Sequence, residues 1–251
     1  MDRIAVYLTF LVYTLPGLVL GFTLHELAHA VVAVRLGDPT PRAQGRISVD
    51  PRQHIDPLGM GLLLTVGFGW AKPVQFNPFY VRNRLQQAAL AAAGPFTNLF
   101  LAVAFLIDMH LEMAGTPDLP GIALDSRLLG HGGPLVILYW ILMQGFFINV
   151  VLFVFNMLPI PGIDGFMVFR GLLGGVLPDL FEWMDRNRQV VWFGAIALLF
   201  LLPQISGGTA NPLATVIVEV QGFLYRALVT SDYPPAGGFV SLFTLFSPTF
   251  P

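Results

Sequence analysis

Residues 4–36 read IAVYLTFLVYTLPGLVLGFTLHELAHAVVAVRL, a largely apolar run with two histidines and a glutamate in its last third. A membrane-spanning helix needs about 20 mostly apolar residues, so this run predicts a span. As a helix it would be roughly 50 Å long, and we therefore expect it to tilt, protrude or bend near Pro16 and Gly17. No A-x-A-like cleavage site precedes the histidines, which favours a retained span over a signal peptide.

The composition of the 251 residues is that of a membrane protein. Hydrophobic residues make up 55% and charged residues 11%, against roughly 25% charged residues in soluble domains, and the mean hydropathy is +0.70. The formal net charge of -2 and the lack of a long Lys/Arg run exclude nucleic acid as a partner. Because the chain has no cysteine, any metal site must use histidine and carboxylate.

Further apolar segments predict an all-α integral membrane protein with about five or six transmembrane helices. The helical segments expected after the first cover residues 85–108, 134–156, 166–177, 190–202 and 213–228. A Gly-rich run at 58–70 is too short to span and predicts a re-entrant hairpin or loop. Two prolines and a glycine at 159–162 break the helix before them. We expect one membrane-embedded domain over residues 1–251, with a core at about 4–178 and C-terminal helices at about 189–230.

Charges in the loops predict the orientation, because Lys and Arg near the ends of a span favour the cytoplasm. Basic residues gather between the first two long spans: Arg35, Arg42, Arg46, Arg52, Lys72, Arg82 and Arg84. Acidic residues dominate the next connection, which holds Asp108, Glu112, Asp118, Asp125 and only Arg127. We therefore expect the N-terminus outside and the active site towards the cytoplasm.

The strongest local signal is an H-E-x-x-H sequence, His25-Glu26-Leu27-Ala28-His29, in the first helix. The i, i+4 spacing places both imidazoles on one helical face, where they can share a tetrahedral Zn²⁺. Beside the ion, the Glu26 carboxylate can take a proton from water whose pKa the metal lowers, and later give it to a leaving amine. The alternatives are a chance pentapeptide or a purely structural polar cluster, but ionisable groups inside a span are costly and usually functional.

A catalytic zinc usually keeps three protein ligands, so a third must come from elsewhere. The candidates at or near membrane depth are Asp164, Asp108, Glu112, His110, His131 and His54. The charge pattern puts all of them except Asp164 and His54 on the opposite side. Asp164 follows the helix break, with Gly162 and Gly165 nearby to let backbone approach closely. Its alternative role, compatible with the first, is the N-cap of a helix that starts at Phe166.

HELAH together with NMLPIPGIDG at 156–165 resembles the site-2 protease family of intramembrane zinc metalloproteases (peptidase family M50). Other stretches resemble its compact bacterial branch: GDPT (37–40), QGR (44–46), HIDPLG (54–59), GWAKPV (69–74) and AGPFTN (93–98). This ordered set covers about residues 21–170. The chain departs from the commoner family form at Met157 and at Gly162-Ile163, which removes no ligand.

The resemblance implies a fold with three core helices and hydrolysis of peptide bonds in membrane-spanning peptide or protein substrates. It also implies a bacterial inner (plasma) membrane location and one Zn²⁺ per chain. The zinc ligands it implies are His25, His29 and Asp164, with Glu26 as the catalytic residue.

Asn98, Asn156 and His54 are further candidates for substrate binding or transition-state stabilisation. The resemblance suggests that the two asparagines hold substrate backbone or stabilise an oxyanion, the alternative being hydrogen bonds between helices. For His54 three roles stand open: a fourth or transient zinc ligand, ordering of its loop through Asp56, or an exposed loop position. We favour loop ordering. The stretch 59–69 is expected to offer an unpaired strand edge to an unwound substrate.

Peptide hydrolysis in a membrane requires access to the carbonyls of a helical substrate and a supply of water. A broken helix and a re-entrant segment that line a wet cavity meet both needs. The second interpretation is a membrane metal-binding or ion-transport protein, but transport needs weak, exchangeable sites along a path and gives Glu26 no role. A catalytically silent scaffold is disfavoured because all four required side chains are present.

Overall fold

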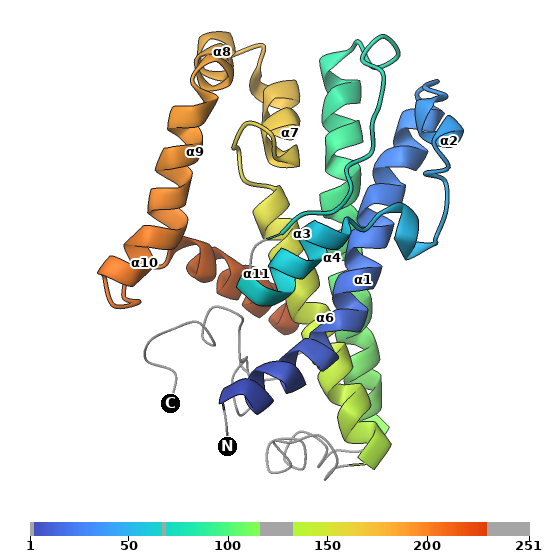
Figure 1. Ribbon diagram of the computed structural model, residues 1–251, viewed down its shortest axis with the longest axis vertical. Coiled ribbons are helices and arrows are strands. Elements are labelled where there is room, and N and C mark those ends of the chain that lie inside the picture. The colour runs from blue at the N-terminus through green and yellow to red at the C-terminus, as the bar shows by residue number, and fades with distance from the viewer. Residues whose placement is uncertain (1–2, 67–68, 116–132, 230–251) are drawn as a thin grey trace. The chain divides into compact units, whose positions relative to one another are not determined.

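The computed structural model describes residues 3–66, 69–115 and 133–229. In chain order the helices, shown in Figure 1, are α1 (Arg3–Arg35), α2 (Thr40–Ala43), η1 (Pro51–Gln53), α3 (Pro57–Val66), α4 (Arg84–Gly115), α6 (Gly133–Asn156), α7 (Asp164–Leu173), α8 (Pro178–Arg186), α9 (Arg188–Ile196), the π-helical η2 (Ala197–Leu201), α10 (Leu202–Ile205) and α11 (Pro212–Val229). The only extended pairing within these ranges is an isolated bridge between Ile55 and Ala71. The prediction of an all-α fold is confirmed.

Among the described residues, five helical stretches are long and apolar enough to cross a membrane. They are Leu8–Arg35, Arg84–Leu111, Gly133–Asn156, Arg188–Ile205 and Pro212–Val229. Each falls on a segment that the sequence predicts as apolar helix. Large apolar side chains on these stretches are exposed, such as Val12, Phe100 and Phe193 at 54%, 70% and 73%, and exposed apolar surface of this extent marks contact with lipid or a partner.

The chain divides into two compact units. The first, here the helical unit, comprises Met1–Gly21, Leu99–Val151 and Ile217–Pro251, and the second, here the site unit, comprises Phe22–Asn98 and Leu152–Val216. Every residue that the sequence assigns to the metal site or its surroundings lies in the site unit. The candidate site therefore lies within one unit.

The helical unit is held by close backbone packing and buried polar groups. A Cβ added to Gly17 of α1 would lie only 2.6 Å from the Gly145 Cα of α6, so the two helices touch through glycines. The Asn149 side-chain amide donates to the Gly17 carbonyl at 3.2 Å, and the Tyr13 ring stacks on Trp140. Small residues and interhelical hydrogen bonds of this kind stabilise helix pairs in membranes.

In the site unit, the segment predicted as a re-entrant hairpin or loop begins with the ten-residue helix α3. The Asp56 carboxylate accepts the Gly59 N–H at 2.8 Å, and Pro57 follows it, so Asp-Pro acts as an N-cap and first helical residue. The chain then doubles back, because a Cβ on Gly59 would lie 2.2 Å from the Trp70 carbonyl oxygen. The prediction of a strand edge is wrong for residues 59–66, which are helical.

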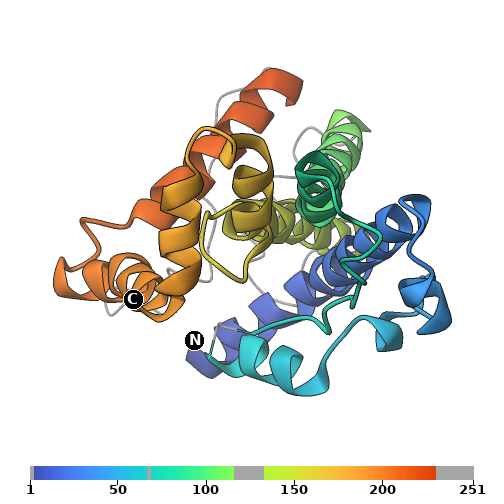
Figure 2. The same ribbon diagram turned by 90° about the horizontal axis from the view of Figure 1, so that it is seen from above.

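The break after α6 is confirmed, and it differs in detail from the prediction. Residues 157–163 form turns, and Gly162 has φ +97°, a conformation that favours glycine. The next helix, α7, begins at Asp164 and ends at Leu173, earlier than the predicted end at residue 177. Trp192 of α9 donates from its indole nitrogen to the Pro161 carbonyl at 2.8 Å, and Figures 1 and 2 both show α9 beside the turn segment.

Candidate metal centre

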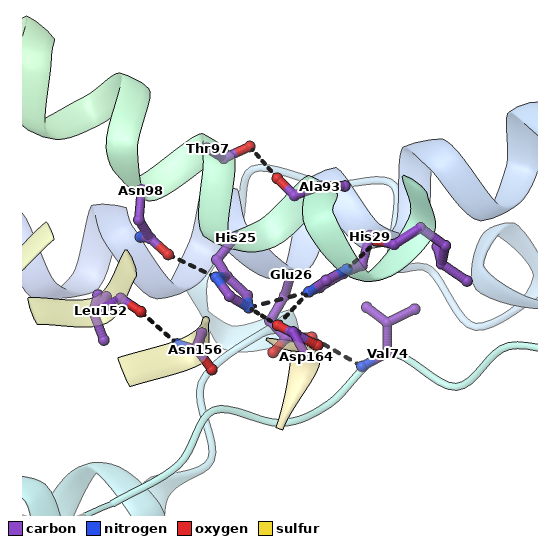
Figure 3. A network of polar contacts seen from close by, with 11 residues as sticks. His25, Glu26, His29, Val74, Ala93, Thr97, Asn98, Leu152, Asn156 and Asp164 are labelled. Atoms are coloured by element: carbon purple, nitrogen blue, oxygen red, sulfur yellow. Dashed lines mark hydrogen bonds and ion pairs between the residues drawn. The ribbon is translucent and has the colours of Figure 1, made fainter. Parts of the chain in front are cut away.

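Three candidate ligands meet at one point of the site unit, as Figure 3 shows. The Nε2 atoms of His25 and His29 lie 3.1 Å apart. The Asp164 Oδ2 atom lies 3.1 Å from the first nitrogen and 3.2 Å from the second. Among the described residues, these are the His, Asp or Glu side chains grouped closely enough to hold a metal ion. The two histidines spaced i, i+4 on α1 and the aspartate that follows the helix break thus lie close together in the structure.

The hydrogen bonds of the two Nδ1 atoms, the ring nitrogens turned away from the cluster, determine which nitrogen of each imidazole faces the cluster. His29 Nδ1 lies 2.8 Å from the Leu90 carbonyl, an acceptor only, so this nitrogen carries the proton. His25 Nδ1 lies 2.6 Å from the Asn98 side-chain oxygen and donates to it. In the neutral imidazoles both Nε2 atoms are then unprotonated lone-pair donors. Partners of this kind orient metal-ligating histidines.

The donor set fits a tetrahedral zinc ion. Zinc bonds of about 2.0 to 2.1 Å separate neighbouring donor atoms by roughly 3.3 Å in a tetrahedron, close to the 3.1 to 3.2 Å observed. Two lone pairs and a carboxylate oxygen repel one another at such distances unless a cation lies between them. Three protein donors also leave one tetrahedral position open, as catalytic zinc sites do.

Asp164 reaches the cluster from the first turn of α7, with Ile163 in the N-cap position. The alternative role of Asp164, the N-cap of this helix, is therefore wrong. A Cβ on Gly165 would lie 2.4 Å from the Met157 carbonyl oxygen, so the absence of a side chain lets α7 start against the turn.

Gly94 places α4 directly against the metal-facing edges of both imidazoles. A Cβ at this position would lie 2.3 Å from His29 Nε2 and 2.5 Å from His25 Nε2, which real Cβ atoms essentially never do. The AGPFTN stretch was noted only for its resemblance to the family, and no role was predicted for Gly94. The only advance signal was the glycine itself, because the close approach depends on how α1 and α4 pack.

Glu26 lies beside the donor atoms and is only 7% exposed. Its Oε2 atom accepts the backbone N–H of Val74 at 2.9 Å. Val74 belongs to the extended segment 69–77, here called the strap, which follows α3. A buried carboxylate with a fixed orientation is the kind of group that serves as a general base.

The other three candidates occupy different positions. Asn98 is fully buried and orients His25. Asn156 donates its side-chain amide to the Leu152 carbonyl at 2.8 Å, within its own helix. His54 is fully buried and donates from Nε2 to the Ser48 carbonyl at 2.7 Å, so the interpretation as an exposed loop residue is wrong. Asp56 caps α3, which leaves the predicted ordering through Asp56 without support.

Comparison with known proteins gives the family. YwhC of Bacillus subtilis (strain 168), provisionally named as a zinc metalloprotease, is 37% identical over 178 residues, which cover 69% of this chain and 75% of the relative. This chain belongs to the site-2 protease family of zinc metalloproteases. Two further relatives carry the same provisional name. Rip2 of Mycobacterium tuberculosis (strain H37Rv) is 28% identical over 78% of this chain and 69% of its own length, and MJ0611 of Methanocaldococcus jannaschii is 31% identical over 60% and 65%.

A comparison with protein-family models gives no match, and neither does a comparison with solved structures. The relatives and the apolar helices together show that this site-2 protease family member is a multi-pass membrane metalloprotease. The relatives' names imply zinc, and the cluster of His25, His29 and Asp164 is a possible site for it.

Proposed function

We propose that this chain hydrolyses peptide bonds of membrane-spanning substrates, using one zinc ion held by His25, His29 and Asp164, with Glu26 as general base and acid. The observation that carries the proposal is the convergence of three donor atoms at 3.1 to 3.2 Å, with both outer ring nitrogens already hydrogen-bonded. A structural cluster would not need unprotonated nitrogens turned towards a carboxylate.

Each side chain at the site has a separate role in the proposed reaction. A zinc ion held by His25, His29 and Asp164 would supply Lewis acidity, which would polarise a carbonyl and let water lose a proton near neutral pH. Glu26 accepts that proton and returns it to the leaving amine, and its bond to Val74 holds the carboxylate in place for both transfers. Asn98 keeps His25 in the metal-binding tautomer. Roles for Asn156 and His54 in substrate binding stay predictions.

We also propose that the active site faces the cytoplasm. All Lys and Arg residues except Arg3, Arg127 and Arg226 lie in the site unit, which contains the metal cluster, and an excess of such residues near span ends favours the cytoplasmic side.

The orientation has a simple test because the chain has no cysteine. A single cysteine introduced at the exposed Arg42 position should react with a membrane-impermeant maleimide only after the cells are opened. Labelling of intact cells, with a periplasmic marker protein as positive control, would place the site outside and contradict the proposal.

Metal removal tests the proposed function. Purified protein in proteoliposomes should cleave a reporter with a transmembrane segment, lose this activity on treatment with a zinc chelator, and recover it when zinc is restored. The same vesicles loaded with a zinc-sensitive dye should show no zinc uptake. Zinc uptake without any reporter cleavage would instead favour the transport interpretation.

A further inference from the structure

The strap, residues 69–77, is fixed to the rest of the site unit at several points. Near its C-terminal end the Asn77 N–H donates to the buried Asp38 carboxylate at 2.6 Å. In its middle the Val74 N–H donates to Glu26. Near its start the Lys72 N–H donates to the His54 carbonyl at 2.8 Å, next to the Ile55–Ala71 bridge. The backbone conformation of the strap therefore determines where a donor meets Glu26.

Arg46 is the charged side chain that holds this strap. It is only 3% exposed, and its guanidinium donates to the carbonyls of Lys72 at 2.9 Å and Pro73 at 2.5 Å. A third hydrogen bond goes to the Gln53 carbonyl, so the guanidinium joins the strap to η1. Burial lowers the pKa of Arg46, and the nearby Glu26 carboxylate acts in the opposite direction.

A single peptide group connects Arg46 to Glu26. The Pro73 carbonyl, which accepts from Arg46, and the Val74 N–H, which donates to Glu26, belong to the same peptide unit. This unit is planar, so an interaction that fixes the direction of the carbonyl also fixes the direction of the N–H. A hydrogen bond at one end of a peptide group also polarises the group and strengthens the bond at the other end.

We propose that Arg46 is a positioning residue for Glu26, acting through the Pro73–Val74 peptide group. The proposal rests on the proposed catalytic role of Glu26. Arg46 touches neither the donor atoms of the metal cluster nor Glu26 by any hydrogen bond described for the chain. Its loss therefore affects the turnover step, because a misaligned base lowers kcat, and leaves the metal ligands in place.

The test compares Arg46→Gln with Arg42→Gln, whose side chain is exposed in the same connection. For Arg46→Gln we expect kcat on the transmembrane reporter to fall about 10- to 100-fold, the range for a misplacement of about 1 Å or the loss of a supporting residue. KM and zinc content should change little. Hydrogen exchange should become faster across residues 70–77.

Arg46→Lys should restore only part of kcat, since an ammonium group lacks the planar fork of donors. Arg42→Gln should match the wild type in all four measurements.

Val74→Pro is a second variant that removes the same N–H directly. It should lower kcat by a similar factor, and combining it with Arg46→Gln should add little, because both changes act on one hydrogen bond. Full kcat in either single variant would overturn the proposal, and so would multiplicative losses in the double variant.

The Glu26→Gln protein separates the proposed role of Arg46 from the proposed catalytic role of Glu26. If it cleaves at more than a tenth of the wild-type rate, the proposed catalytic role of Glu26 fails, whereas an inactive Glu26→Gln beside a fully active Arg46→Gln refutes only the role of Arg46.

Discussion

Glu26→Gln should abolish cleavage of a transmembrane reporter while zinc content stays at the wild-type level. The amide has nearly the same shape as the carboxylate, and its oxygen can still accept the Val74 N–H that Oε2 now accepts at 2.9 Å. It cannot take up a proton at neutral pH. Loss of a general base costs about 10² to 10⁴ in rate, so we expect kcat to fall by about a thousandfold.

The control for this variant is Glu182→Gln in α8. Glu182 is exposed, and its side chain forms an i, i+4 ion pair with Arg186 at 3.7 Å. Exposed pairs of this kind contribute little to stability, so activity and zinc content should be those of the wild type. Cleavage by Glu26→Gln at more than a tenth of the wild-type rate would remove Glu26 from the mechanism.

Gly94→Ala is the second variant for which we expect a large effect. The added methyl group would meet His29 Nε2 at 2.3 Å and His25 Nε2 at 2.5 Å. Either α4 shifts, or the imidazoles turn and lose their hydrogen bonds to Leu90 and Asn98. Losing one such supporting partner typically costs 10- to 100-fold in metal affinity. Because both ligands are affected, we expect at least a 100-fold loss of zinc affinity, and cleavage should be lost with it.

Gly194→Ala in α9 is the matched control for Gly94→Ala. Gly194 is also a helical glycine, and nothing lies within 4 Å of a Cβ added there. Alanine is the better helix former by about 1 kcal/mol, so this control should be at least as stable as the wild type, with unchanged zinc affinity in a competitive chelator titration. Wild-type zinc affinity in Gly94→Ala would show that α4 does not lie against the imidazoles.

Most of the predicted fold follows from patterns that are local in the sequence. The apolar runs gave the spans, because span length follows from bilayer thickness. The i, i+4 spacing of His25 and His29 gave two ligands, because one helical turn brings such side chains together. Asp164 followed from its place after the proline break, and family resemblance supported it. These inferences needed no knowledge of how distant segments pack.

The inferences that failed or were missed depend on distant contacts. Gly94 matters only because α4 crosses the imidazoles of α1. Arg46 binds carbonyls of Lys72 and Pro73, some 26 and 27 residues away, and nothing in the composition of the loop indicates this. The helix α3 is a different case, because the Asp56-Pro57 pair is a local helix-start signal. The Gly-rich composition of the segment led to the interpretation as a strand edge instead.

Zinc binding by two imidazoles and one carboxylate is tested most directly by the zinc content and the zinc X-ray absorption spectrum of the purified wild-type protein. We expect one zinc per chain, with two imidazole ligands and the remaining donors oxygen, at bond lengths of about 2.0 to 2.2 Å. In Asp164→Ala the zinc content should fall. Protein purified in the presence of zinc that holds none, or a spectrum that requires three imidazoles, would contradict the account.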